Sequence, residues 1–283
     1  MSEARGFSLL ERFELKYHIP VSLADEIGDF LKPYCEEDFY SKKTPGGFYW
    51  ITNLYLDSPR WTFLSWKKAG KLDRFNMRVR CYGEHPDNEG SFHFEVKRKV
   101  ANVGYKSRGT IKGVNPSFVW SHPEEEWPCK TETDKMYVRQ FIGKTHIYNA
   151  QPRLLTQYKR RAWFGLNEEY SRVTIDMGMR FREENGFDYS VDSAEMWSTS
   201  LPRFFQRDCN AVLELKCPAL QVPFWMLDLI HRFNLKHGAF SKFGNAAAEW
   251  KRVYENPRDF RDARFPYLAG DFEDSKVLLS AKL

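Results

Sequence analysis

The 283-residue sequence lacks the features that define several large protein classes. Its five cysteines are scattered and none form a CxxC pair, which argues against a disulfide framework or a zinc site. No run of 18 apolar residues occurs, so no transmembrane helix is expected. The start of the chain has no apolar segment typical of a signal peptide, and we expect a cytoplasmic protein with reduced thiols. No P-loop or dinucleotide-binding glycine pattern is present.

The sequence also has no large excess of positive over negative charge. The formal net charge of +5 does not by itself indicate a nucleic-acid partner, and none is expected. A hydrophobic fraction of 42% is typical of a globular chain, and the 16% aromatic content suits a β-rich core. No repeat or linker divides the sequence. We therefore predict one domain over residues 1–255 and a tail over 256–283.

Short segments of alternating polar and apolar residues dominate the chain and predict half-buried strands. We expect eight of them, at residues 12–17, 48–56, 74–82, 91–100, 104–111, 153–164, 171–180 and 211–216. Helical spacing predicts helices at residues 22–33, 134–144, 224–233 and 244–254, and Ser58-Pro59 reads as the start of another that ends near Ala69. Residues 113–132 read as a mostly polar insertion. The pattern predicts an α+β fold, with a closed or nearly closed antiparallel β-barrel of about eight strands and flanking helices.

The polar faces of these strands carry mainly cations. Side chains two residues apart share a face of a strand. By this rule one face of each strand gathers a set of charged side chains: Glu14 with Lys16, Arg78 with Arg80, Glu95 with Lys97 and Lys99, Lys106 with Arg108, Arg172 with Asp176, and Glu214 with Lys216. A single strand of this kind is explained by a solvated face of a sheet. A solvated face does not explain the same cation-rich division on several strands.

Clustered cations repel one another. Two like charges about 4 Å apart cost about 4 kcal/mol at an effective dielectric of about 20. A barrel interior lined with them is stable when an anion fills it, and a linear polyphosphate offers regularly spaced charges to Arg and Lys. A barrel of about eight strands is wide enough to hold one such ligand.

The carboxylates on the same faces suggest a metal. A divalent cation bound to phosphates typically takes one or two protein carboxylates. Mn²⁺ or Mg²⁺ is the expected cofactor, with Glu214 as first choice of ligand and Glu14, Glu95 and Asp176 as further candidates, although each of these could instead balance charge. His93 shares the polar face and could act as a general base, but a hydrogen-bonded structural histidine is the favoured interpretation.

An ordered set of segments resembles the triphosphate tunnel metalloenzyme superfamily, and within it the catalytic domain of the VTC-type polyphosphate polymerases. The segments span residues 7–254 and are RFELKY at 12–17, NLYLDS at 53–58, RVRCYG at 78–83, FEVK at 94–97, YKRRAW at 158–163, RVTID at 172–176, LELK at 213–216 and FSKF at 240–243. The resemblance implies an antiparallel β-tunnel that binds ATP and inorganic polyphosphate. It implies phosphate-binding catalytic roles for Lys16, Arg78, Arg80, Lys97, Arg160, Arg172 and Lys242. Substrate contacts are expected from Tyr158 and Ser241 by resemblance, and from Lys99, Lys106, Arg108 and Lys216 on the strand faces.

Two departures from the family pattern bear on activity. The superfamily often begins with Glu-x-Glu-x-Lys, whereas this chain has Arg12 at the first position, which argues against simple triphosphate hydrolysis. Eukaryotic polymerases carry a Lys two positions before the final Ser, and this chain has Ala239 there. The resemblance implies transfer of the ATP γ-phosphoryl group to a polyphosphate chain. The alternatives are a non-catalytic polyphosphate- or nucleotide-binding module and a tripolyphosphate hydrolase.

Overall fold

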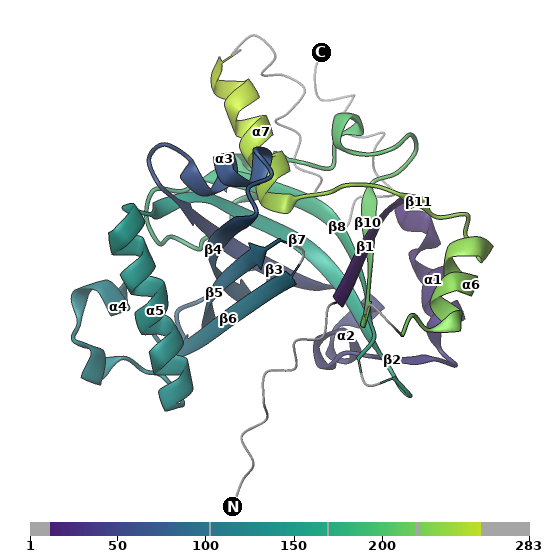
Figure 1. Ribbon diagram of the computed structural model, residues 1–283, viewed down its shortest axis with the longest axis horizontal. Helices are drawn as coiled ribbons and strands as arrows, with labels where there is room; N and C mark the ends of the chain where they lie inside the picture. Colours follow the sequence, from purple (N-terminus) through teal and green to yellow (C-terminus); the bar gives the residue numbers. More distant parts are fainter. Residues whose placement is uncertain (1–11, 102, 169, 219–220, 256–283) are drawn as a thin grey trace, which may run out of the picture.

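The computed structural model describes residues 12–101, 103–168, 170–218 and 221–255, so the predicted tail at 256–283 lies outside the described residues. Within these ranges the chain forms one large antiparallel sheet with helices around it (Figure 1). The strands are β1 Arg12–Ile19, β2 Cys35–Glu37, β3 Tyr49–Asp57, β4 Asp73–Tyr82, β5 Ser91–Val100, β6 Val103–Lys112, β7 Gln151–Gly165, β8 Arg172–Glu183, β9 Trp197–Ser198, β10 Ala211–Pro218 and β11 Lys236–His237.

The strand order along the sheet is β11-β1-β10-β8-β7-β3-β4-β5-β6, with β2 beside β7 and β9 beside β8. All eight predicted strands are present, as β1, β3 to β8 and β10, and the predicted α+β class is confirmed. Hydrogen-bonded closure into a barrel is not observed, because no ladder joins β6 to β1 or β11 among the described strands. The sheet instead curves so that side chains of β1 and β5 meet: Lys97 Nζ lies 3.1 Å from Glu14 Oε2.

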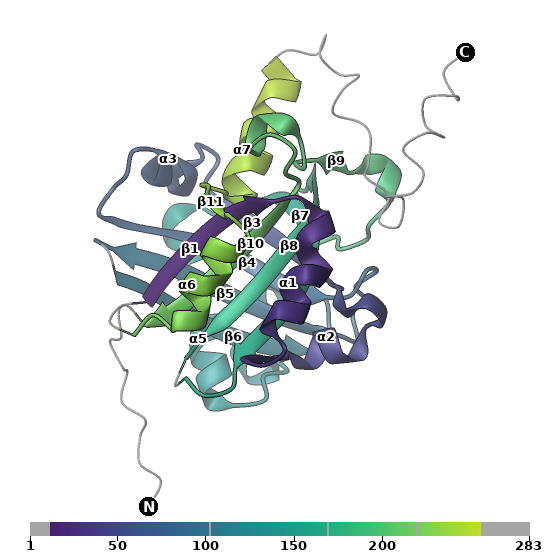
Figure 2. The same cartoon turned by 90° about the vertical axis from the view of Figure 1, so that its right-hand side faces the viewer.

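Helices cover the outer face of this curved sheet on two sides, and others lie at its ends, where they also reach the inner face. They are α1 Ala24–Leu31, α2 Phe39–Lys43, α3 Thr62–Lys68, α4 Phe118–Ser121, α5 Glu132–Tyr148, α6 Phe224–Arg232 and α7 Lys242–Glu255. Figures 1 and 2 show α4 and α5 beside β4 to β6, and α1 and α6 beside β1, β8 and β10. None of the described helices is long and apolar enough to span a bilayer.

Each covered region of the sheet has its own apolar core. Phe94 and Val79 of the strands pack with Phe141 of α5, and Ile175 and Leu213 pack in a second core with α1 and α6. These are the apolar halves of the alternating strands, which burial removes from water. The opposite, inner face of the sheet therefore receives the charged halves.

Two local predictions need correction. The helix expected at Ser58 begins later, at Thr62, because Trp61 adopts a left-handed conformation (φ 55°) and Ser58 and Pro59 form the preceding turn. Ser58 still assists the helix, since its Oγ accepts a hydrogen bond from the Thr62 N–H at 3.1 Å. The stretch 113–132 is not simply a polar insertion: it contains α4, whose residues Phe118 and Trp120 pack against the core on the α5 side.

Candidate functional site

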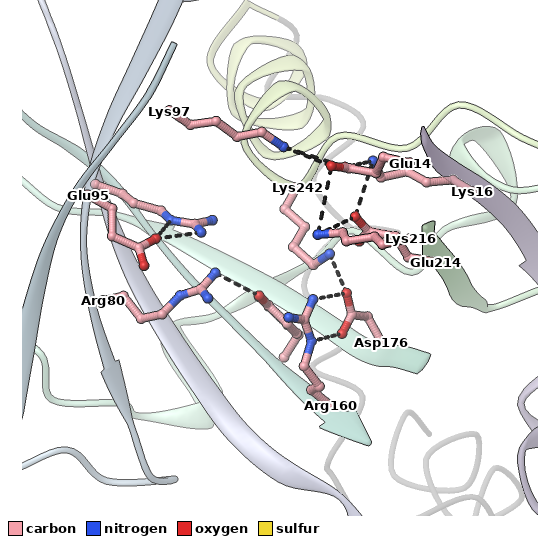
Figure 3. Close-up of polar contacts among 12 residues, drawn as sticks. Glu14, Lys16, Arg80, Glu95, Lys97, Arg160, Asp176, Glu214, Lys216 and Lys242 are labelled. Atoms are coloured by element: carbon pink, nitrogen blue, oxygen red, sulfur yellow. Dashed lines mark hydrogen bonds and ion pairs between the residues drawn. The ribbon is translucent and has the colours of Figure 1, made fainter. Parts of the chain in front are cut away.

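Charged side chains from seven strands and two helices gather on the inner face of the sheet. Figure 3 shows Arg80, Glu95 and Lys97 facing Glu14, Lys216 and Lys242. The cations outnumber the carboxylates: Lys16, Lys67, Arg78, Arg80, Lys97, Lys106, Arg108, Arg160, Arg172, Lys216 and Lys242 accompany Glu14, Glu95, Asp176 and Glu214. The predicted sharing of one face is thus observed for most of the predicted site residues.

Glu95 is the centre of the first group. Its side chain is buried, and three cations surround it: Arg78 Nε lies 2.8 Å from Oε2, while Arg108 Nε and Lys106 Nζ lie 2.7 and 2.6 Å from Oε1. Burial opposes ionisation, but these cations hold the pKa of Glu95 far below its usual range. Glu95 is a permanent anion that positions three phosphate-binding candidates.

Asp176 is the centre of the second group. Its carboxylate receives two hydrogen bonds from the Arg160 guanidinium, at 2.6 and 2.7 Å, and one from Lys242 Nζ at 2.5 Å. Burial alone would raise the pKa of Asp176, yet the two cations outweigh it and lower it to about 2. Burial would likewise raise the pKa of the neighbouring Tyr158 phenol, but Arg80, Arg160 and Lys242 lower it. The Tyr158 hydroxyl is therefore set among cations, as a phosphate-contacting group requires.

Glu14 and Glu214 form the third group, where β1 pairs with β10. Lys216 Nζ lies 2.9 Å from Glu214, Lys16 lies 3.8 Å from it, and Lys16 also contacts Glu14. Lys97 reaches Glu14 from β5, on the other side of the inner face. Burial and the charge of Glu214 raise the pKa of Glu14, but Lys216 and Lys97 outweigh them, so its pKa is lowered. The pKa of Glu214 is also lowered, and both carboxylates are ionised.

The metal assignment can be tested against this geometry. Within the described ranges no cluster of three or more His, Cys, Asp or Glu side chains could hold a metal on its own. Glu14 and Glu214 share Lys16 and Lys216 as ion-pair partners, so one divalent cation could bridge the two carboxylates. A site of two carboxylates completed by phosphate oxygens fits Mg²⁺ or Mn²⁺. Glu95 and Asp176 fit less well, because both oxygens of each already accept hydrogen bonds from Arg guanidinium groups, whereas the ion pairs of Glu14 and Glu214 are to lysines.

Four predicted site residues lie outside the three carboxylate-centred groups. Arg80 is buried and donates to the neutral oxygens of Asn53 and Tyr158, at 2.8 and 3.3 Å. Arg172 lies 3.7 Å from Asp38 at the edge of the inner face. Lys99 lies near the end of β5, paired with Gly104, where no contact to the three groups is recorded. Ser241 immediately precedes α7 and its hydroxyl accepts a hydrogen bond from the Gly244 N–H at 3.0 Å, so part of its role is structural.

Lys67 and His93 complete the inner face. Lys67 of α3 was not predicted as a site residue; it contacts Ser241, and burial together with Lys16 and Lys97 lowers its pKa to about 8. Its only signal in the sequence was a cation at the end of a predicted helix. His93 lies 2.9 Å from Thr110 Oγ1, and burial and Arg108 lower its pKa to about 4, so it is neutral at pH 7. A hydrogen-bonded, neutral histidine matches the structural interpretation.

Solved structures with a similar arrangement have low sequence identity. A candidate adenylate cyclase from Bacillus halodurans has a TM-score of 0.43 at 11% identity, covering 82% of this chain and 96% of its own. A protein from Pyrococcus horikoshii OT3 has a TM-score of 0.41 at 9% identity, over 84% and 99%. A candidate adenylyl cyclase from Hippeastrum, described as having a dominant triphosphatase activity, has a TM-score of 0.43 at 13% identity, over 83% and 95%.

Sequence comparison gives the more specific result. No curated protein matches the sequence. The sequence profile of the VTC domain matches residues 11–251, which include every described strand and most of α7. The chain belongs to the VTC domain family.

Proposed function

We propose that this protein is a divalent-metal-dependent polyphosphate polymerase, which transfers the γ-phosphoryl group of ATP to the end of a polyphosphate chain. The observation that carries the proposal is the cation-rich inner face, on which side chains of β1 and β10 oppose those of β4 to β6. Lys97 and Lys106 remain solvent-accessible there, with 52% and 44% of their side chains exposed. A linear anion could therefore reach cations from both sides at once.

The balance of charge favours a phosphate ligand. Each buried carboxylate already neutralises part of two or more cations, yet the cations remain in excess. Residual repulsion among them is relieved when an anion binds. Arg160 and Arg78 present guanidinium groups whose orientation is held by carboxylates, so little side-chain entropy is lost on binding.

The chemistry requires positioning more than covalent catalysis. The terminal oxygen of the polymer attacks the γ-phosphorus in line, the bond to the β-phosphate breaks, and ADP leaves. Arg80, Arg160 and Lys242 lie where they could neutralise charge on the transferred group, which preorganised cations do without reorganisation. A Mn²⁺ or Mg²⁺ ion held by Glu214, with Glu14 beside it, would supply further charge neutralisation and orient the phosphates.

Incubation of the purified protein with ATP and Mn²⁺ tests the proposal, with polyphosphate-stained gels and an ADP assay as readouts. We expect a ladder of polymer and an equivalent amount of ADP. A reaction without metal is the control for cofactor dependence. Orthophosphate release without polymer would replace the polymerase by a tripolyphosphate hydrolase.

A non-catalytic polyphosphate- or nucleotide-binding module is the second candidate. Ala239 supports it, because this exposed residue lies two positions before Ser241 and brings no charge to the start of α7. Lys236, on β11, is exposed and lies opposite His18 in the pairing with β1. This candidate predicts tight binding of polyphosphate with no consumption of ATP under any metal condition.

A further inference from the structure

The inner face changes character at the end where α2 lies. Along β4 the inner positions run Arg78, Arg80, Tyr82, and the paired position opposite Arg80 on β5 is His93. Tyr82 stacks on Tyr40 of α2, with ring centroids 4.6 Å apart and an angle of 13° between the planes. Cations therefore give way to rings at this end.

Tyr49 and His93 extend the rings into one surface. Tyr49 of β3 lies 5.1 Å from the Tyr40 ring, and His93 lies 5.6 Å from the Tyr82 ring. We name Tyr40, Tyr49, Tyr82 and His93 the ring platform. None of its members carries a charge at pH 7: His93 is neutral, and burial raises the pKa of Tyr49 and Tyr40.

The ring platform reaches solvent at Tyr40 and adjoins the cations. Tyr40 is 39% exposed and its neighbour Phe39 is 62% exposed. These two rings of the five-residue helix α2 therefore leave apolar surface that packing on the sheet does not bury. Tyr82, on which Tyr40 stacks, follows Arg80 on the inner face of β4, and His93 pairs with Thr110, two residues beyond Arg108 on β6. Arg108 is itself 37% exposed and is bound to Glu95 in the first cation group. An exposed ring thus lies directly beside phosphate-binding candidates.

We propose that the ring platform binds the purine base of the nucleotide by stacking, while the triphosphate extends from Arg108 onto the cation-rich inner face. The proposal rests on the proposed function, because it takes the ligand of the inner face to be a nucleoside triphosphate. Every base has a π face, and stacking on aromatic side chains contributes about 1–3 kcal/mol per base, which corresponds to about 5- to 150-fold in affinity. Neutral rings next to fixed cations match a ligand that is apolar at one end and anionic at the other.

The placement also gives the ligand a direction. Figures 1 and 2 both show α2 at the end of the sheet away from α3 and α7. With the base at the α2 end, the γ-phosphate points toward Lys242 of α7 and Lys67 of α3. These two cations, with Ser241 in contact with Lys67, then lie where the γ-phosphate would meet the acceptor polymer.

The test compares ATP with inorganic tripolyphosphate, which has no base, in metal-free calorimetric titrations of the full chain. Tyr40→Leu should weaken ATP binding at least about fivefold and leave tripolyphosphate binding within twofold of wild type. Tyr40→Phe keeps the ring and should restore ATP affinity. Tyr105→Leu is the matched control: Tyr105 is 44% exposed, lies on the outer face of β6 and should change neither ligand.

Each outcome decides between the two proposals. Loss of ATP affinity alone supports the ring platform. Unchanged ATP affinity, or an equal loss for both ligands, overturns the platform while leaving phosphate binding on the inner face intact. A wild-type protein that binds neither ligand overturns the proposed function, and the platform with it.

A second measurement does not depend on a variant that must fold. Photolabelling of the wild-type protein with 8-azido-ATP should mark the peptides that carry Tyr40 or Tyr82, and unlabelled ATP should compete. Labelling confined to peptides of α3 or α7 would overturn the proposal, because it would place the base at the opposite end.

Discussion

At the scale of single residues, a few buried carboxylates organise the site. Glu95, Asp176 and Glu214 are each less than 5% exposed, and each contacts at least two cations. A buried charge is tolerated when it is paired and hydrogen-bonded. The same pairing fixes the cations in place before any ligand arrives. The alternation of polar and apolar residues predicted which side chains share a face, but not which carboxylate each cation would contact.

Glu214→Gln tests the metal assignment. The change keeps the shape of the side chain but removes a charge, so metal-dependent turnover should fall at least about 100-fold, since even the partners of metal ligands contribute about 10- to 100-fold. Metal-free binding of tripolyphosphate should be retained or tighten, because Lys16 and Lys216 lose an internal anion. Steady-state kinetics in Mn²⁺ and calorimetry provide the two readouts. Wild-type turnover in Mn²⁺ would show that Glu214 is not a ligand.

Arg80→Ala tests the inner face as the phosphate site. Arg80 is buried and its hydrogen bonds go to neutral oxygens, so its charge remains available to an anion. Loss of a hydrogen bond to a charged group costs about 1.5–3 kcal/mol, and tripolyphosphate affinity should fall about 10- to 150-fold. Lys32→Ala is the control, since 75% of the Lys32 side chain is exposed on the outer side at the end of α1. Equal effects of the two variants on affinity would contradict the assignment.

Lys106 makes binding depend on pH. Burial lowers its pKa from 10.5 to about 7, with Arg108 and Arg78 acting in the same direction and Glu95 opposing them. At pH 8 the unliganded protein therefore holds Lys106 partly neutral, and a bound phosphate favours its charged form. We expect proton uptake when tripolyphosphate binds at pH 8, measured by calorimetry in buffers of different ionisation enthalpy. Lys106→Arg should reduce that uptake.

As pH rises, Lys106 affects the stability of the fold and the affinity for anions in opposite directions. Because folded Lys106 holds its proton less tightly than unfolded Lys106, its contribution to stability increases as pH rises from about 7 toward 10.5. Its contribution to anion affinity falls over the same range. A tripolyphosphate affinity that is constant from pH 6 to 9 would contradict the lowered pKa.

At the scale of elements, close contact between a helix and a strand supports the inner face from behind. A Cβ added at Gly109 of β6 would lie 2.4 Å from the Asp134 carbonyl oxygen and 2.7 Å from the Val138 nitrogen of α5. The Asp134 carboxylate also accepts a hydrogen bond from the Thr110 N–H at 2.9 Å. The helix is thus seated directly behind the strand that carries Lys106 and Arg108. Strand alternation predicted β6, but nothing local predicted this contact.

Gly109→Ala should therefore destabilise the protein. The methyl group meets backbone atoms that cannot rotate away, and overpacking of this kind costs about 1–3 kcal/mol. Gly143→Ala is the control within α5, because nothing lies within 4 Å of an added Cβ there, and it should be neutral or stabilising by up to about 1 kcal/mol. Urea unfolding curves measure both. Equal stability of the two variants would show that α5 can shift freely on β6.

At the scale of the whole molecule, the fold brings cations of distant segments together. Lys97 of β5 and Glu14 of β1 are 83 residues apart and lie on strands that are each second from an end of the strand order, yet they form an ion pair. Such an arrangement concentrates like charge on the inner face and opposes folding. The repulsion that opposes folding is relieved when an anion binds, so the ligand should stabilise the folded protein.

Tripolyphosphate should therefore raise the melting temperature even without metal. A ligand at about 100 times its Kd stabilises the folded state by about 2.7 kcal/mol, which corresponds to a shift of several degrees for a chain of this size. Differential scanning calorimetry measures the shift, with sodium chloride at matched ionic strength as the control. An equal shift with sodium chloride would indicate general screening and not a bound ligand.

The sequence by itself determined the eight long strands, their charged faces and the α+β class, because side-chain alternation is a local property with a period of two residues. It also identified most of the inner-face residues, from Lys16 to Lys242. Only the tertiary structure decided that the strand ladder is open between β6 and β1, that Lys67 joins the cations, and that Tyr40 stacks on Tyr82. These features depend on pairing between distant segments and on how helices dock, and no local pattern records either.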